Sequence, residues 1–222
     1  MFKHQQRDLD IIKEKLITMG GEAEDRVYKA TLSIINRDAK MANDVIKADR
    51  EIDQMEVDIE EHCLKILALY QPVAKDLRLI IAILKINNDI ERVGDLAVNI
   101  AERGAYLANH PEFVIFFDIK KMAMKVESML TASIDSLVNL DVQLAYKIRA
   151  EDDEIDAMNR EMYAKAKEVI VQNPEHINFI LHTISAGRHL ERIADHATNI
   201  AEDIIYMEEA DIVRHTPEVF TD

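Results

Sequence analysis

The 222-residue chain has little of what several fold classes require. Its only cysteine, Cys63, excludes an internal disulfide and fits a reducing compartment. Five glycines and four prolines are too few for a fold built on tight turns. The longest apolar stretch, Leu77–Ile86, is interrupted by Arg78 and Lys85 and is far too short to cross a bilayer.

Positive charge is also scarce. Lysine and arginine total 27 against 42 acidic residues, which gives a net charge of −15 and argues against binding of DNA or RNA. Such acidity suits metal cations or basic partners, although a solvated acidic surface is its commoner meaning. The first ten residues contain no apolar signal core, so we expect a cytoplasmic protein that meets membranes only through partners.

Good helix formers dominate the sequence, and 48% hydrophobic residues allow a sizeable core. Pro72 and Pro174 stand at matching places in the two halves, and Pro111 lies near the midpoint. Asp38 and Asp141 are expected to be helix N-caps. The chain is therefore predicted to be all-α, with helical segments at about 4–36, 39–69, 75–108, 113–139, 142–171 and 176–209.

The two halves repeat one another. Residues 88–102 (NDIERVGDLAVNIAE) and 188–202 (RHLERIADHATNIAE) are identical at eight of fifteen positions. Residues 49–55 (DREIDQM) likewise match residues 152–158 (DDEIDAM). The simplest architecture is two tandem antiparallel three-helix bundles, residues 1–110 and 111–222, related by internal duplication. A continuous six-helix bundle with internal pseudo-symmetry is the alternative.

The repeat preserves pairs of carboxylates as well as apolar spacing. On a helix, Glu91 and Asp95 lie side by side on the face opposite the apolar stripe that contains Ile90 and Val93. If the second and third helices of each half are neighbours, four carboxylates converge, and such like charges call for a cation. The predicted metal ligands are Asp49, Asp53, Glu91, Asp95, Asp152, Asp156, Glu191 and Asp195, with Asn99, Glu102, Asn199 and Glu202 as supplementary candidates. A charged solvent face is the ordinary alternative.

The residues beside the acidic pairs are expected to have ordinary structural roles. His196 is expected at the surface, with metal ligation as the alternative. Arg92 and Arg192 are expected to form ion pairs across helices, with phosphate binding or orientation of a carboxylate as the alternative. Phe113, Phe116 and Phe117 follow the midpoint and fit either an interface patch or packing at the junction of the two bundles.

These motifs resemble those of the PhoU family of phosphate-signalling regulators over essentially the whole chain. The resembling features are Met19-Gly20, Asp49-x-x-x-Asp53, Glu91-Arg-Val-Gly-Asp95 with Asn99-Ile-Ala-Glu102, Asp152-x-x-x-Asp156, and the run from His189 to Ala201 that contains Glu191, Asp195, His196 and Asn199. The two halves differ at Gly94 and Leu96, which become Ala194 and His196, so the two sites can differ in metal, occupancy or affinity.

The resemblance implies two three-helix bundles, usually a homodimer, and multinuclear iron or zinc clusters on the acidic pairs. It also implies a regulator that restrains the phosphate-starvation response. Such a protein acts between the ATPase subunit of the high-affinity phosphate transporter and a membrane sensor histidine kinase.

Two other functions remain open from the residues. A carboxylate-bridged metal enzyme or iron-storage bundle typically uses Glu-x-x-His pairs inside its core, and this chain contains none. An adaptor whose acidic faces bind a basic partner without metal is the third candidate. Since no catalytic constellation can be placed in the sequence, we expect a protein that is not an enzyme.

Overall fold

The computed structural model describes residues 3–48, 50–110 and 113–213, and every regular element in these ranges is a helix. The elements are α1 (Lys3–Asn36), α2 (Ala39–Lys47), α3 (Arg50–Tyr70), α4 (Ala74–Ala108), α5 (Ile119–Asn139), α6 (Val142–Gln172), the 3-10 helix η1 (Pro174–His176) and α7 (Ile177–Glu209). The all-α prediction is confirmed.

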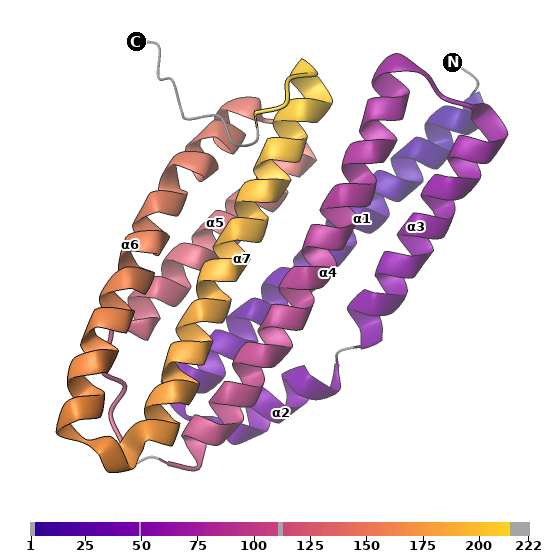
Figure 1. Ribbon diagram of the computed structural model, residues 1–222. Helices are drawn as coiled ribbons and strands as arrows, with labels where there is room; N and C mark the ends of the chain where they lie inside the picture. The colour runs from indigo at the N-terminus through magenta and orange to yellow at the C-terminus, as the bar shows by residue number, and fades with distance from the viewer. Residues whose placement is uncertain (1–2, 49, 111–112, 214–222) are drawn as a thin grey trace, which may run out of the picture.

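The helices form two layers (Figure 1). The helices α6, α7, α4 and α3 stand side by side in front, with α1 and α5 behind them. Within each half three helical rods form a bundle, because α2 and α3 together take the place that α6 has in the second half. The predicted tandem three-helix bundles are thus present. They share one continuous hydrophobic core, and the division into units 1–110 and 111–222 stays a prediction.

The two bundles meet along α4 and α7, which run antiparallel. Contacts between Lys85 and Asp203, between Asp89 and His196, and between the rings of Tyr106 and His182 succeed one another along this junction. The predicted apolar stripes are confirmed as core: Ile86, Ile90, Val93, Ala97 and Ile100 on α4, and Leu190, Ile193, Ala197, Ile200 and Ile204 on α7, are all 0% exposed.

The duplication extends to the backbone of one turn. Asp38 accepts hydrogen bonds from the amides of Lys40 and Met41, and Asp141 accepts one from the amide of Leu144, so both predicted N-caps are confirmed. The residue before each cap is left-handed, with φ of 56° at Arg37 and 53° at Leu140. These turns reverse the chain in the same way in both halves.

Two predicted segments have the wrong limits. The segment 39–69 is not one helix, because α2 ends at Lys47 and α3 begins at Arg50. The helix expected from residue 113 begins only at Ile119, where Asp118 caps it by accepting from the amide of Lys121. The chain before that cap is rich in β-branched and aromatic residues, which helices favour less.

The aromatic cluster after the midpoint packs at the junction. The ring of Phe113 lies 4.1 Å from that of His176 and 5.3 Å from that of Phe179, centroid to centroid. Phe117 packs against the common core. Of the two interpretations left open by the sequence, junction packing therefore describes Phe113 and Phe117.

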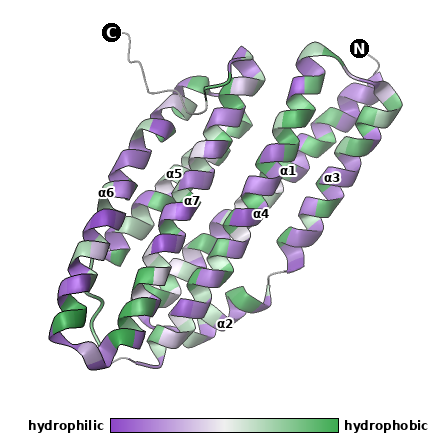
Figure 2. Cartoon of the chain, in the orientation of Figure 1, coloured by the Kyte–Doolittle hydropathy of each residue, from purple (hydrophilic) through white to green (hydrophobic). Residues whose placement is uncertain are grey.

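The outer surface is polar in keeping with the composition. Figure 2 shows largely hydrophilic residues along the visible sides of α6, α7 and α4. Within the described ranges, no helix combines the length and the apolar character that crossing a membrane requires.

Candidate metal centre

Three predicted ligands of the first half converge between α3 and α4. Asp53 comes from the first turn of α3, and Glu91 and Asp95 come from successive turns of α4. One carboxylate oxygen of each lies within 4.8 Å of the corresponding oxygens of the other two. The predicted convergence of the acidic pairs of the second and third helices is therefore present in this half for Asp53, Glu91 and Asp95, while Asp49 lies outside the described residues.

A glycine allows the two helices to approach closely beside this cluster. A Cβ atom on Gly94 would lie only 3.0 Å from Cδ1 of Ile52, the residue before Asp53. Ile52 is buried in the core, so the backbone of α3 is held against α4 at this level. The close approach places the Asp53 carboxylate within reach of Glu91 and Asp95.

Two members of the cluster are partly buried, with side-chain exposures of 21% for Glu91 and 40% for Asp95, whereas Asp53 is exposed. Burial, followed by repulsion from Asp95, raises the pKa of the Glu91 carboxyl above its usual value. Burial and then the nearby Glu60 and Asp53 carboxylates raise the pKa of Glu56. The side chains therefore lie between two helices, where ionised carboxylates repel one another.

Arg92 is the cation beside the cluster, and its ion pairs lie within α4 rather than across helices as expected, although its charge also opposes the rise in the pKa of Glu56 on α3. Its Nε lies 3.3 Å from Oε2 of Glu91, and its Nη1 lies 3.3 Å from Oδ2 of Asp95. Both partners belong to α4 itself. The guanidinium lies along its own helix because two acceptors stand within one turn of it.

The second half brings together the equivalent residues of α6 and α7. Asp156 is a charged neighbour of Asp152, Glu191 and Asp195, and each of these three carboxyls has a second member of the set as a neighbour, so the four lie near one another. Burial, then the charges of Asp195 and Asp156, raise the pKa of Asp152 to about 6. Burial is also the first cause of the raised pKa values of Glu191 and Asp195.

This second site is less tightly gathered than the first. Among the described residues, only Asp53, Glu91 and Asp95 bring three ligand atoms within 4.8 Å of one another. In the second half, Arg160 Nη1 lies 3.3 Å from Oδ2 of Asp156. Ala194 occupies the position equivalent to Gly94, so the second half lacks the glycine that marks the close approach in the first.

The supplementary candidates have other partners. Asn99 donates to the Asp95 carbonyl at 2.8 Å, and Asn199 donates to Oδ1 of Asp89 at 3.3 Å. Glu202 lies 3.3 Å from the guanidinium of Arg149, and these side chains are only 12% and 9% exposed. Glu102 pairs loosely with Arg103 at 3.5 Å. The predicted ligand Asp49 lies outside the described residues.

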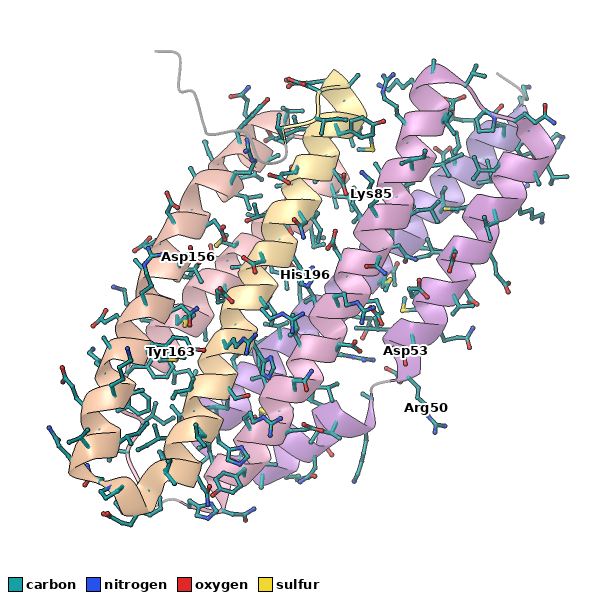
Figure 3. All side chains as sticks on the ribbon, viewed as in Figure 1. Arg50, Asp53, Lys85, Asp156, Tyr163 and His196 are labelled. Atoms are coloured by element: carbon teal, nitrogen blue, oxygen red, sulfur yellow. The ribbon has the colours of Figure 1, made fainter. Side chains whose placement is uncertain are left out.

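His196 is not at the surface, and this expectation is corrected. Its Nδ1 lies 2.7 Å from Oδ1 of Asp89, across the junction of α7 with α4. Figure 3 shows His196 between the two helices. Consecutive residues point about 100° apart around a helix, so His196 faces a different side from Asp195, and α4 covers that side.

The donor set of the first half fits a hard cation. Asp53, Glu91 and Asp95 offer carboxylate oxygens, which such cations prefer. The Oε2 atom of Glu91 is buried and makes no well-formed hydrogen bond among the described residues, with only the Arg92 guanidinium nearby. A cation would compensate the burial, and then the repulsion from Asp95, that raise the pKa of Glu91.

A duplicated all-α protein with a group of neighbouring carboxylates in each half is the class that this fold and these sites define. The sequence profile of the PhoU domain matches residues 16–104 and 119–204, one match in each half. The chain therefore belongs to the PhoU family.

Relatives match over nearly the full length. The phosphate-specific transport system accessory protein PhoU homolog of Aquifex aeolicus is 39% identical over 94% of this chain and 95% of that protein. The crystal structure of PhoU from Pseudomonas aeruginosa superposes with a TM-score of 0.90 at 34% identity, covering 93% of this chain and 99% of that chain. The phosphate transport system regulatory protein PhoU from Streptococcus pneumoniae gives a TM-score of 0.84 at 28% identity, covering 94% and 99%.

Proposed function

We propose that this protein is a non-enzymatic regulator of phosphate transport. The observation that carries the proposal is the match of both halves, over nearly the whole chain, to proteins named as phosphate-specific transport accessory or regulatory proteins. In this role the protein restrains high-affinity phosphate uptake and the phosphate-starvation response when phosphate is plentiful. It acts in the cytoplasm as a homodimer, by contact with the transporter's ATPase subunit and with a sensor histidine kinase.

Metal ions, iron or zinc, bind the acidic sites in this proposal. Asp53, Glu91 and Asp95 would hold the metal of the first half, and Asp152, Asp156, Glu191 and Asp195 that of the second. A bound cation would neutralise charges that otherwise repel one another between adjacent helices. Because each site joins two helices, its occupancy would fix the surface that those helices present to a partner.

The test of the regulatory role uses the ATPase subunit and the cytoplasmic part of the histidine kinase from the same organism. We expect the purified protein to bind both on a biosensor, and its deletion to activate a phosphate-starvation promoter in phosphate-rich medium. Expression of the wild-type chain should restore repression. Repression that is normal in the deletion strain contradicts the proposal.

The metal is tested separately by elemental analysis of protein purified without chelators or a histidine tag. We expect bound metal in the wild type and its loss in Asp95→Asn/Asp195→Asn, with helicity nearly unchanged because both side chains lie off the core. The matched control is Asp10→Asn/Asp44→Asn, which makes the same charge change at two exposed positions. Absence of metal from every protein would favour an adaptor whose acidic faces bind a basic partner.

A further inference from the structure

A groove of about 380 Å³ is lined by residues of α1 and α5. These two helices lie behind α4 and α7 (Figure 1). The described lining of the groove is acidic, aromatic and apolar, and none of these residues is basic: Gly21, Glu24, Asp25, Val27, Tyr28, Glu127, Leu130 and Thr131. The candidate metal ligands stand on α3, α4, α6 and α7, so the groove is a separate feature.

Two half-buried carboxyls face this groove from opposite walls. Glu24 belongs to α1, and its Oε1 atom is buried without a hydrogen-bond partner among the described residues, although the Thr131 side chain interacts with the carboxyl and opposes the rise in its pKa. Glu127 belongs to α5 and accepts a hydrogen bond from the Thr31 hydroxyl. Burial is the first cause of the raised pKa of both carboxyls. Each therefore lies where its negative charge is poorly solvated and where an added cation would stabilise it.

The rest of the lining suits an aliphatic stem behind that cation. Val27 and Leu130 are buried apolar residues at the groove, and Tyr28 stands at it with 53% of its surface exposed. A Cβ atom on Gly21 would meet nothing within 4 Å, so that end is open. Lysine and arginine side chains combine a charged head with an apolar stem, and their cations are attracted to aromatic faces.

We propose that the α1–α5 groove binds a lysine or arginine side chain from a basic segment of a partner protein. The buried, unpartnered oxygen of Glu24 receives the cationic head, Glu127 supplies the second carboxylate, and Tyr28 covers the stem. Charge complementarity selects this occupant, because Glu24 and Glu127 face the groove and its described lining holds no base, whereas the third acid, Asp25, pairs with Lys29. The proposal extends the regulatory role by giving it a contact surface, and it requires no metal.

The test is a titration of isotope-labelled protein, followed by NMR, with Nα-acetyl-lysine methylamide and with Nα-acetylarginine methylamide. Excess Mg²⁺ is present, so that the carboxylates of the candidate metal sites compete less for the probes. We expect saturable shifts at the amides of Gly21, Tyr28 and Thr131. The neutral Nα-acetylleucine methylamide should cause none of comparable size.

The deciding variant is Glu24→Gln/Glu127→Gln, which keeps the shape of both side chains. It should weaken binding of the two cationic probes roughly tenfold or more, since charge-assisted contacts contribute on that order. Glu14→Gln/Glu61→Gln removes the same charge from exposed positions elsewhere and should leave the affinity unchanged. Equal affinity in both double variants overturns the proposal.

Two further measurements exclude other occupants. Spermidine that binds the groove while both amino-acid probes fail would identify a free polyamine and overturn the proposal. Sedimentation of Glu24→Gln/Glu127→Gln should match that of the wild type. A change in its oligomeric state would identify a second copy of this chain as the occupant, which also overturns it.

Discussion

His196 of α7 and Asp89 of α4 form a polar contact of 2.7 Å across the junction of the two bundles. Their side chains are only 17% and 15% exposed, and Asn199 donates to the same Asp89 oxygen at 3.3 Å. Further along the junction, Lys85 lies 3.1 Å from the buried Asp203. Apolar side chains alone tolerate sliding of two helices, whereas these pairs define one antiparallel register.

The Asp89–His196 contact is therefore predicted to be energetically coupled. In a double-mutant cycle of Asp89→Ala and His196→Ala, urea unfolding should give a coupling free energy of about 1–2 kcal/mol, because both groups are largely desolvated. The exposed Lys29–Asp25 pair on α1 serves as the control. Its coupling should stay below about 0.5 kcal/mol. Equal coupling in the two cycles would contradict a stabilising role for the junction pair.

The sequence could predict the helices and their buried faces, but not this junction. The apolar stripe from Ile86 to Ile100 and its repeat on α7 follow helical spacing. The buried face of each helix can therefore be predicted from the sequence of that helix alone. The contact of Asp89 with His196 joins residues 107 positions apart and depends on how two helices slide against one another. That register is a property of packing, so His196 was wrongly expected at the surface.

The candidate site, too, could be predicted from the sequence only in part. Spacing along α4 was enough to put Glu91 beside Asp95, and Asp53 was expected to join them if the second and third helices were neighbours. The sequence did not indicate that the carboxylates of the first half would lie closer together than those of the second. That difference depends on distances between helices, including the approach of Ile52 to Gly94. The break between α2 and α3 was missed because residues 39–69 keep helix-forming composition throughout.

The groove carboxyls are predicted to destabilise the fold at neutral pH. Because the folded-state pKa values of Glu24 and Glu127 are raised, the fold favours their protonated forms. Their stabilising contribution is present below the unfolded value of 4.5 and is lost as pH rises through the folded values. At pH 7 Glu24→Gln/Glu127→Gln should thus be about 1 kcal/mol more stable than the wild type by urea unfolding. The advantage should vanish near pH 4, and an advantage that persists there would contradict this cause.

His182 is predicted to make the α4–α7 junction sensitive to acid. Its ring stacks on Tyr106 with centroids 3.7 Å apart, and burial, then the charges of Arg103 and His110, lower its pKa below 6.5. The fold favours neutral His182, so its contribution is present above pH 6.5 and is lost as pH falls through the folded pKa. His182→Phe keeps an aromatic ring without a titrating group. The melting temperature of this variant should fall less than that of the wild type between pH 7 and pH 5, and an equal fall would contradict the assignment.

The two acidic sites are predicted to bind cations with different affinities. Asp53, Glu91 and Asp95 already hold three oxygens within 4.8 Å of one another, whereas the carboxylates of the second half must first draw together and Asp156 must leave Arg160. Preorganised ligands lose less entropy on binding, so the first half should bind more tightly. Asp53→Asn and Asp156→Asn are matched substitutions at equivalent positions. In a calorimetric titration of chelator-treated protein with Mn²⁺, Asp53→Asn should abolish the tighter phase and Asp156→Asn the weaker one. The reverse assignment would show that closeness of ligands in the metal-free protein does not determine the order of binding.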